Sequence, residues 1–145
     1  MVEASSMVKD CVFCGIVAGT VPAHIIWSNE FTVAFLDQAP ANDGHTLVVP
    51  RKHVRNLLDA TPAEAGEVMA AAAEVTKLLN ERFRPAGFTL FQANEKAGWQ
   101  DAFHLHIHVV PRWPSDDLVL PWSTITAEPA RLAKVADRIC SRDMN

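Results

Sequence analysis

The stretch Phe103–Val109 constrains the fold more than any other part of this chain, because histidines and apolar residues alternate along it. Successive side chains of a β-strand point to opposite faces of the sheet. We expect one face to be buried through its four apolar residues, Phe103, Leu105, Ile107 and Val109. The other face carries His104, His106 and His108. Because imidazole carries protons near neutral pH and binds metals, this face predicts a reaction centre or a metal site.

Shorter patterns along the rest of the chain predict an α+β domain with an antiparallel sheet of about five strands. Thr61-Pro62-Ala63-Glu64 combines an N-cap residue, a proline at the first helical position and a glutamate at the third, and apolar residues then recur at helical spacing. We therefore expect a long helix from there to about Arg84, and a final helix near Glu128–Arg142. Runs of β-branched, aromatic or apolar residues predict the other strands, at Ile25–Ser28, Thr32–Leu36, His45–Val49 and Phe88–Ala93.

The length of 145 residues suits one domain. We expect residues 1–10 to form a flexible extension and residues 11–145 to form a single domain with a C-terminal helical segment. The net charge is −4 and no block of lysine and arginine occurs, which argues against a nucleic-acid partner. No apolar run is long enough to span a membrane, and residues 1–10 lack the apolar core of a secretory signal, so we expect a cytoplasmic protein.

The three cysteines do not indicate a disulfide scaffold, because their number is odd. Cys11 and Cys14 have the spacing of a pair that clamps one tetrahedral zinc ion. A redox pair and two idle thiols are the alternatives, although no thioredoxin-like βαβ context surrounds the pair. Cys140 lies on the apolar face of the final predicted helix, where we expect it to be part of the core.

Several motifs in a fixed order resemble the histidine triad (HIT) superfamily of nucleotide hydrolases and transferases, and most closely its bacterial Hint-like members. They are Cys-x-Phe-Cys at 11–14, Phe35-Leu36-Asp37, the run Gly44–Pro50, Lys52-His53, and His104–Arg112 preceded by Asn94 and Gln100. The resemblance implies a five-stranded sheet that pairs with that of a second copy into a ten-stranded dimer sheet. It also implies attack on the α-phosphate of a nucleotide derivative, with release of a nucleoside monophosphate.

The resemblance assigns roles to individual residues. His106 matches the nucleophile, and a neutral imidazole can attack phosphorus and later act as a leaving group. His108 would donate a proton or hydrogen bond to a phosphate oxygen or the departing group. The residues implied in substrate binding are Phe13, Ile16 and Phe35 around the base, Asp37 at the ribose, and Asn94, Gln100 and the Gly98–Ala102 backbone at the phosphate. His45 aligns with a family histidine near the site, where it could orient His106 or cap a turn.

The resemblance also implies a zinc site. In zinc-bearing bacterial members of the family, the ligands match Cys11, Cys14, His53 and His104. Four protein ligands leave no open coordination position, so the Zn²⁺ ion would be structural rather than catalytic.

One position departs from the common family pattern. Many members read Gly-Gln-Ser or Gly-Gln-Thr before the triad, whereas this chain has Trp99-Gln100-Asp101. A hydroxyl can donate a hydrogen bond to phosphate, but an ionised carboxylate cannot and would repel it. Asp101 therefore either points away from the site, bonded to the backbone, or accepts a proton from a histidine.

Two other functional classes stay open at this point. A metal-dependent hydrolase could use the three triad histidines as ligands, although the outer two would lie about 13 Å apart at their Cα atoms. A non-catalytic nucleotide-binding or scaffold protein would bind AMP without turnover.

Overall fold

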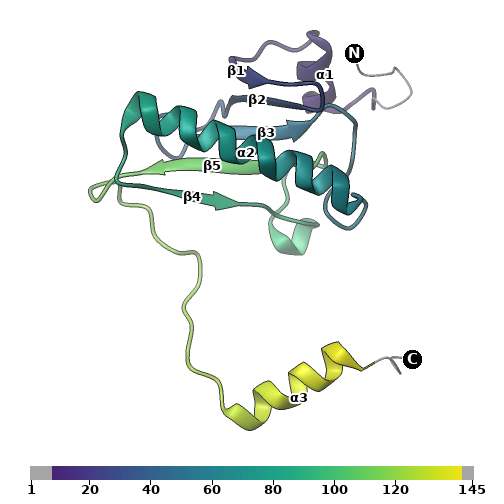
Figure 1. Cartoon of the computed structure of the whole chain (residues 1–145), viewed down its shortest axis with the longest axis vertical. Coiled ribbons are helices and arrows are strands. Elements are labelled where there is room, and N and C mark those ends of the chain that lie inside the picture. The colour runs from purple at the N-terminus through teal and green to yellow at the C-terminus, as the bar shows by residue number, and fades with distance from the viewer. Residues whose placement is uncertain (1–7, 142–145) are drawn as a thin grey trace.

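A five-stranded antiparallel sheet forms the centre of the molecule in a computed structural model that describes residues 8–141 (Figure 1). The strand order is β1-β2-β3-β5-β4. The strand bounds are β1 Ile25–Ser28, β2 Thr32–Leu36, β3 Thr46–Pro50, β4 Gly87–Phe91 and β5 Ile107–Arg112. The predicted α+β class, its antiparallel sheet and the four strands outside the triad are confirmed: β1 and β2 have the predicted bounds, and the ends of β3 and β4 differ by one or two residues.

The long helix α2, Pro62–Phe83, crosses one face of the sheet. Its predicted N-cap is confirmed, because the Oγ1 atom of Thr61 accepts a hydrogen bond from the Glu64 amide at 3.1 Å. The helix ends where Arg84 adopts a left-handed conformation with φ of 47°. Its apolar stripe packs on sheet residues that include Ala34, Val48 and Val109 to form the main core.

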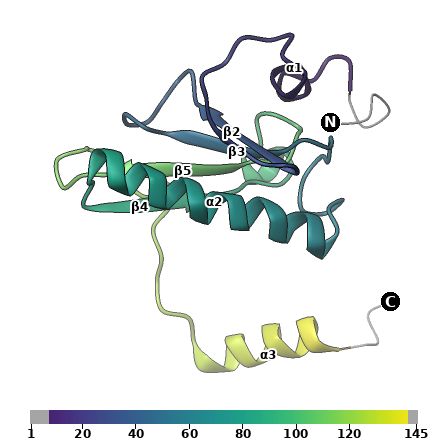
Figure 2. The same ribbon diagram turned by 45° about the horizontal axis from the view of Figure 1, so that its top comes forward.

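The opposite face of the sheet is covered by the short helix α1, Val12–Ala18, so that the two helices lie on opposite sides (Figure 2). Ile16 of α1 packs in a second cluster with Phe35 and Leu47. Leu47 pairs with Phe35 on one side and with His108 on the other, and residues paired across strands share a face. The sheet therefore presents the triad towards α1 and its apolar stripe towards α2.

The triad strand is shorter than the alternation predicts. β5 begins at Ile107, and His104 and His106 lie in the preceding segment because the Leu105 amide donates to the Val54 carbonyl at 2.7 Å rather than to a sheet strand. The alternation of faces holds from Leu105 onward. Phe103 was expected to be buried and is not: 38% of it is exposed, and the Arg55 guanidinium lies 4.4 Å from its ring centroid.

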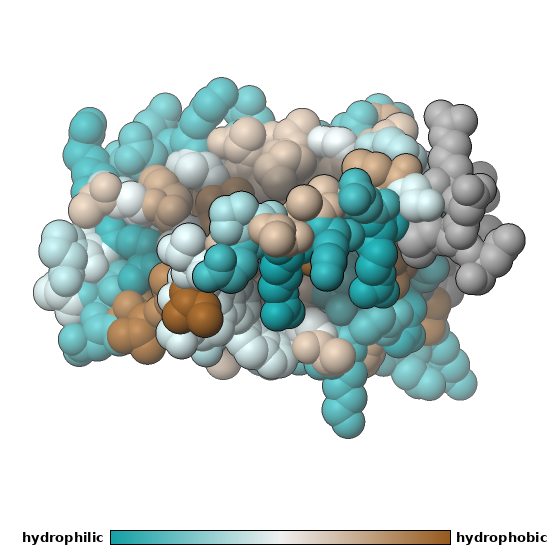
Figure 3. Space-filling view, turned by 90° about the horizontal axis from the view of Figure 1, so that it is seen from below, coloured by the Kyte–Doolittle hydropathy of each residue, from teal (hydrophilic) through white to brown (hydrophobic). Residues whose placement is uncertain are grey.

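The final helix α3, Pro129–Cys140, is present as predicted but does not join the core. It lies apart from the sheet at the end of an extended linker (Figures 1 and 2). Its apolar residues are exposed, Ile139 to 76%, and so is Cys140, which corrects the expectation of a core cysteine. The face seen from below, which includes α3, is mainly hydrophilic with smaller hydrophobic patches (Figure 3). Amphipathic patterning located the helix, but it could not say which surface the apolar stripe covers.

The start of the described chain is tied to α1. The Val8 amide donates to the Cys14 Sγ atom at 3.4 Å, and the Cys11 amide donates to the Val8 carbonyl at 3.1 Å. The flexible extension expected over residues 1–10 otherwise falls on residues 1–7, outside the described part. Within residues 8–141, no helix is long and apolar enough to cross a membrane. The cytoplasmic location stays a prediction.

Candidate active site and metal centre

His106 is held in the tautomer that a nucleophile needs. Its Nδ1 atom lies 2.8 Å from the His104 carbonyl oxygen. A carbonyl only accepts hydrogen bonds, so Nδ1 carries the proton and the neutral ring keeps its lone pair on Nε2. The side chain is 4% exposed, which leaves little freedom to reorient.

His108 is oriented by His45. The Ala41 amide donates to His45 Nδ1 at 3.0 Å, so the neutral His45 ring carries its proton on Nε2. That atom lies 2.9 Å from His108 Nδ1, which must accept. His108 therefore carries its proton on Nε2, free to donate to a substrate. Of the two roles left open for His45, the hydrogen bond from the Ala41 amide is the turn cap, whereas its other ring nitrogen orients His108 rather than His106.

Burial keeps His108 neutral. Desolvation lowers its pKa to about 4, and the neighbouring His106 and His45 add to this effect. The ring stacks on Phe91, with centroids 4.0 Å apart and 10° between the planes. Burial also lowers the pKa of His45, opposed by the charge of Asp37. At neutral pH both rings are uncharged, so the tautomers deduced from their hydrogen bonds apply.

Asp37 lies at the end of β2, next to these histidines. Its Oδ1 atom accepts from the Ala39 amide at 2.9 Å, and its Oδ2 atom lies 3.5 Å from His45 Nε2. The side chain is 19% exposed, so it keeps an open acceptor towards solvent. Contact with ribose hydroxyls stays a prediction.

The three residues expected around a nucleobase do meet. Phe13 packs edge-on against Phe35, with centroids 5.3 Å apart, and against His106, at 5.2 Å. Ile16 and Phe35 are buried in the cluster beneath α1, whereas Phe13 is half-buried. Phe13 is thus the most exposed of the three, and contact of any of them with a nucleobase stays a prediction.

Gln100 has different partners from those that the resemblance implies. Its Nε2 donates to the carbonyls of Arg55 at 2.7 Å and Ala102 at 3.0 Å. Its Oε1 accepts from Asn56 Nδ2 at 3.0 Å and from the Glu95 amide at 2.8 Å. All four positions of the amide are occupied, so Gln100 holds the loop in place and has no donor left for a phosphate.

Asn94 also makes internal hydrogen bonds. Its Oδ1 accepts from the Leu57 amide at 2.9 Å and from Gln92 Nε2 at 2.8 Å, and its Nδ2 donates to Gln92 Oε1 at 2.7 Å. One proton of Nδ2 remains, so contact with a phosphate stays a prediction for Asn94.

Asp101 bonds to the backbone, as one of the two alternatives expected, but it does not point away from the site. It accepts no proton from His106, whose Nε2 atom carries the lone pair. Its Oδ1 accepts from the Ala102 amide at 2.8 Å and also lies 3.7 Å from His106 Nε2. Its side chain is 83% exposed. A hydrated carboxylate therefore lies beside the Nε2 atom of His106.

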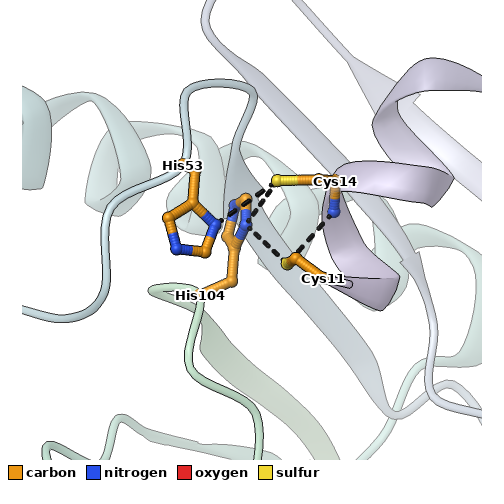
Figure 4. A group of neighbouring side chains, drawn as sticks. All are labelled: Cys11, Cys14, His53 and His104. Atoms are coloured by element: carbon orange, nitrogen blue, oxygen red, sulfur yellow. Dashed lines mark hydrogen bonds between the residues drawn. The ribbon is translucent and has the colours of Figure 1, made fainter. Parts of the chain in front are cut away.

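The four residues of the expected zinc site converge from three parts of the chain, the start of α1, the segment after β3 and the segment before β5 (Figure 4). Their ligand atoms all lie within 4.8 Å of one another. Cys11 Sγ is 3.4 Å from His104 Nδ1, and Cys14 Sγ is 3.3 Å from His53 Nδ1 and 3.6 Å from His104 Nδ1. Bond lengths to zinc of 2.0–2.3 Å in a tetrahedron place ligands about 3.3–3.8 Å apart, so the residues fit this ion.

The chemistry of these donors supports the same conclusion. His104 Nε2 lies 2.8 Å from the Pro50 carbonyl, so it carries the proton and leaves a lone pair on Nδ1, which faces the sulfurs. Burial lowers the pKa of His104 to about 4, which keeps the ring neutral, as a metal ligand must be. Burial also raises the pKa of the Cys14 thiol, so a thiolate there needs a neighbouring cation.

The sequence did not reveal two partners of the site. Asn56 is fully buried and anchors Gln100, and Glu95 forms a bidentate ion pair with Arg55 across the same loop. Both lie in polar stretches without periodicity. For the hydrogen bond between His45 and His108, the sequence offered one indication, which is that His45 aligns with a family histidine near the site.

Among residues 8–141, two groups of side chains could hold a metal ion, and the three triad histidines do not belong to the same group. His104 belongs to the cysteine cluster, His108 belongs to a cluster with Asp37 and His45, and His106 belongs to neither. This arrangement disfavours a hydrolase in which the three histidines bind one catalytic ion.

Comparisons with known proteins agree with this geometry. The HIT domain family model matches residues 18–115, and the chain therefore belongs to the HIT family. It is 33% identical to Protein hit of Bacillus subtilis over 138 residues, covering 92% of this chain and 94% of that protein. It is 27% identical to the adenosine 5′-monophosphoramidase of Schizosaccharomyces pombe over 134 residues, covering 91% and 97%.

Solved structures show the same fold. A crystal structure from Streptococcus mutans superposes with a TM-score of 0.89 at 34% identity, covering 94% of this chain and 87% of that one. A zinc-bound histidine triad family protein from Mycobacterium smegmatis superposes with a TM-score of 0.72 at 31% identity, covering 89% and 97%.

Proposed function

We propose that this protein hydrolyses nucleoside phosphoramidates or related adenylyl compounds at the α-phosphate, through a nucleotidyl intermediate on His106. The observation that carries the proposal is the fixed tautomer of His106. Its Nδ1 proton is bound to the His104 carbonyl, so the Nε2 lone pair is available beside a neutral donor, His108. The relationship to a monophosphoramidase supports the same reaction class.

The reaction proceeds in two displacements. In the first, Nε2 of His106 forms a bond to the α-phosphorus while the bond from phosphorus to the leaving group breaks. The leaving group takes its electron pair with it and receives a proton from solvent, while the Nε2–H group of neutral His108 donates a hydrogen bond to a phosphate oxygen. In the second, water attacks the nucleotidyl-histidine and releases its proton to solvent, and the nucleoside monophosphate departs as His106 recovers its lone pair.

The residues around the nucleophile prepare these steps. The His104 carbonyl stabilises the positive charge that develops on the His106 ring, because it accepts the Nδ1 hydrogen bond. His45 fixes the donor tautomer of His108. Asp37 is proposed to accept from the ribose, and Phe13, Ile16 and Phe35 are proposed to enclose the base.

We further propose that Cys11, Cys14, His53 and His104 hold a structural Zn²⁺ ion. When bound, the ion would fix the position of His104 and thereby of the carbonyl that orients His106. His104 thus links the two sites: its ring faces the cysteines and its backbone faces the nucleophile. The zinc-bound mycobacterial relative supports this assignment.

A homodimer is proposed from two unpartnered surfaces. β4 is an edge strand whose last residues, Leu90 and Phe91, are 36% and 47% exposed. The apolar residues of α3 are exposed along the whole helix. The Streptococcus structure covers 94% of this chain. The part that it does not cover is shorter than α3, which has 12 residues, so at least part of α3 is matched in that structure. An amphipathic helix whose apolar residues are held away from its own core is consistent with packing on a second copy.

The test is release of AMP from adenosine 5′-phosphoramidate by the purified protein and by its His106→Ala variant. We expect turnover by the parent and a loss of at least about a thousandfold in the variant, because the variant lacks the nucleophile. AMP binding without turnover by either protein would indicate a non-catalytic nucleotide-binding protein instead. Equal turnover by both would refute the mechanism.

A further inference from the structure

A cleft of about 810 Å³ opens next to the nucleophile, between the start of α1, the segment after β3 and the loop before β5. Two of its lining residues also contact His106. The Phe13 ring centroid lies 5.2 Å from that of His106, and Asp101 Oδ1 lies 3.7 Å from His106 Nε2. A substituent on a phosphorus atom bound at His106 can therefore extend into this cleft.

The wall of the cleft is acidic. Carboxylates outnumber basic side chains, with Asp10, Asp59, Glu64 and Asp101 against Lys52 and Arg55. Both bases are already paired, since Lys52 Nζ lies 3.5 Å from Glu64 Oε1 and Arg55 lies 2.7 Å from Glu95 Oε2. Lys52 and Glu64 offset one another within the wall, and Arg55 is bound to Glu95, so the remaining carboxylates give the cleft an excess of negative charge that favours a cationic group.

Asp101 places one of these charges at the reacting centre. The Ala102 amide donates to its Oδ1 at 2.8 Å, which orients the hydrated carboxylate so that this oxygen lies beside His106. Where a hydroxyl would donate to an anionic group, this side chain repels it. Two unit charges about 5 Å apart near a protein surface interact strongly enough to change a rate by about tenfold or more.

Resting on the proposed function, we propose that Asp101 and this cleft select substrates whose leaving group carries a positively charged amine, over those whose leaving group carries a carboxylate, phosphate or sulfate. Asp101 acts here as a specificity-determining residue. It takes no part in bond making, and its charge acts in opposite directions on cationic and anionic leaving groups.

The test uses three adenosine 5′-phosphoramidates whose N-propyl chain ends in an ammonium, a methyl or a carboxylate group. At pH 7 and low salt, we expect kcat/KM of the parent to be about tenfold higher for the ammonium compound than for the carboxylate compound. The ratio should fall towards one as salt screens the charges. It should also fall towards one in Asp101→Asn, which keeps an oxygen for the Ala102 amide, and persist in Asp101→Glu.

The matched control is Asp43→Asn, an exposed aspartate outside the cleft, which should leave the ratio unchanged. Equal kcat/KM values for the charged compounds in the parent would overturn the inference, and so would a ratio that Asp101→Asn does not alter. Lack of turnover of all three compounds would refute only the proposed function. In that case the ratio of the dissociation constants of the carboxylate and ammonium compounds replaces the ratio of kcat/KM values. It should respond to Asp101→Asn in the same way.

Discussion

Replacement of Gln100 by alanine separates a structural role from a phosphate-binding one. The change removes four hydrogen bonds from a side chain that is 4% exposed, and strands the Glu95 amide, the Asn56 amide group and two carbonyls. At about 1 kcal/mol for each bond, the free energy of unfolding should fall by about 3–4 kcal/mol. For a chain of this size, that loss lowers Tm by about 10 °C.

Thermal and urea unfolding, followed by circular dichroism, measure this loss. Gln38→Ala is the matched control, because Gln38 is exposed, and it should leave Tm within about 2 °C of the parent. Gln100→Glu should destabilise as much as the alanine variant, because it turns an acceptor oxygen towards the Arg55 and Ala102 carbonyls. An unchanged Tm in Gln100→Ala, together with weaker nucleotide binding, would refute the structural reading and restore the phosphate contact.

Three further predictions concern metal, pH and assembly. The protein should bind one equivalent of Co²⁺ and show the absorption spectrum of tetrahedral thiolate ligation. The Cys14→Ser variant should lose that spectrum, and a spectrum retained in the variant would rule out the site. In zinc-free protein, the pKa values of His104 and His108 are lowered by burial from 6.5 to about 4, so the unfolded chain takes up protons first as pH falls. Stability should therefore be full above pH 6.5 and decline towards pH 4, by up to about 3 kcal/mol for each histidine, and urea unfolding at pH 7 and 5 that gave equal values would contradict this. Leu132→Asp with Ile139→Asp should weaken a dimer at least about a hundredfold, because two apolar contacts are lost, as sedimentation would measure; a parent that is already monomeric at high concentration would end the proposal.

Patterns with a period were informative about the fold. The alternation around the triad located the face of each residue from Leu105 onward, although the strand itself begins only at Ile107. Thr61 and Glu64 fixed the start of α2, because a helix cap is a local interaction. The position of α3 was not predictable in this way. An amphipathic helix needs an apolar surface to cover its apolar side. Its own sequence does not say whether that surface belongs to the same chain or to a partner.

The same distinction holds for the site: residues that belong to a motif could be predicted, and a residue whose role depends on tertiary contacts could not. The four residues expected to hold zinc were named as a group because each matched a motif, and the structure brings all four together. Zinc binding by them stays a proposal. The role of Gln100 could not be inferred, since a side-chain amide serves a loop and a phosphate equally well. Only the positions of the Arg55 and Ala102 carbonyls show that its donors are occupied.

The most direct test of the mechanism is capture of the nucleotidyl intermediate. The protein is mixed with adenosine 5′-phosphoramidate, quenched in alkaline denaturant to preserve the bond between nitrogen and phosphorus, digested and examined by mass spectrometry. We predict an adenylyl group on the peptide at His106, absent from His106→Ala. Adenylylation of a different residue, or full turnover with no adenylylated peptide at any quench time, would contradict nucleophilic attack by His106.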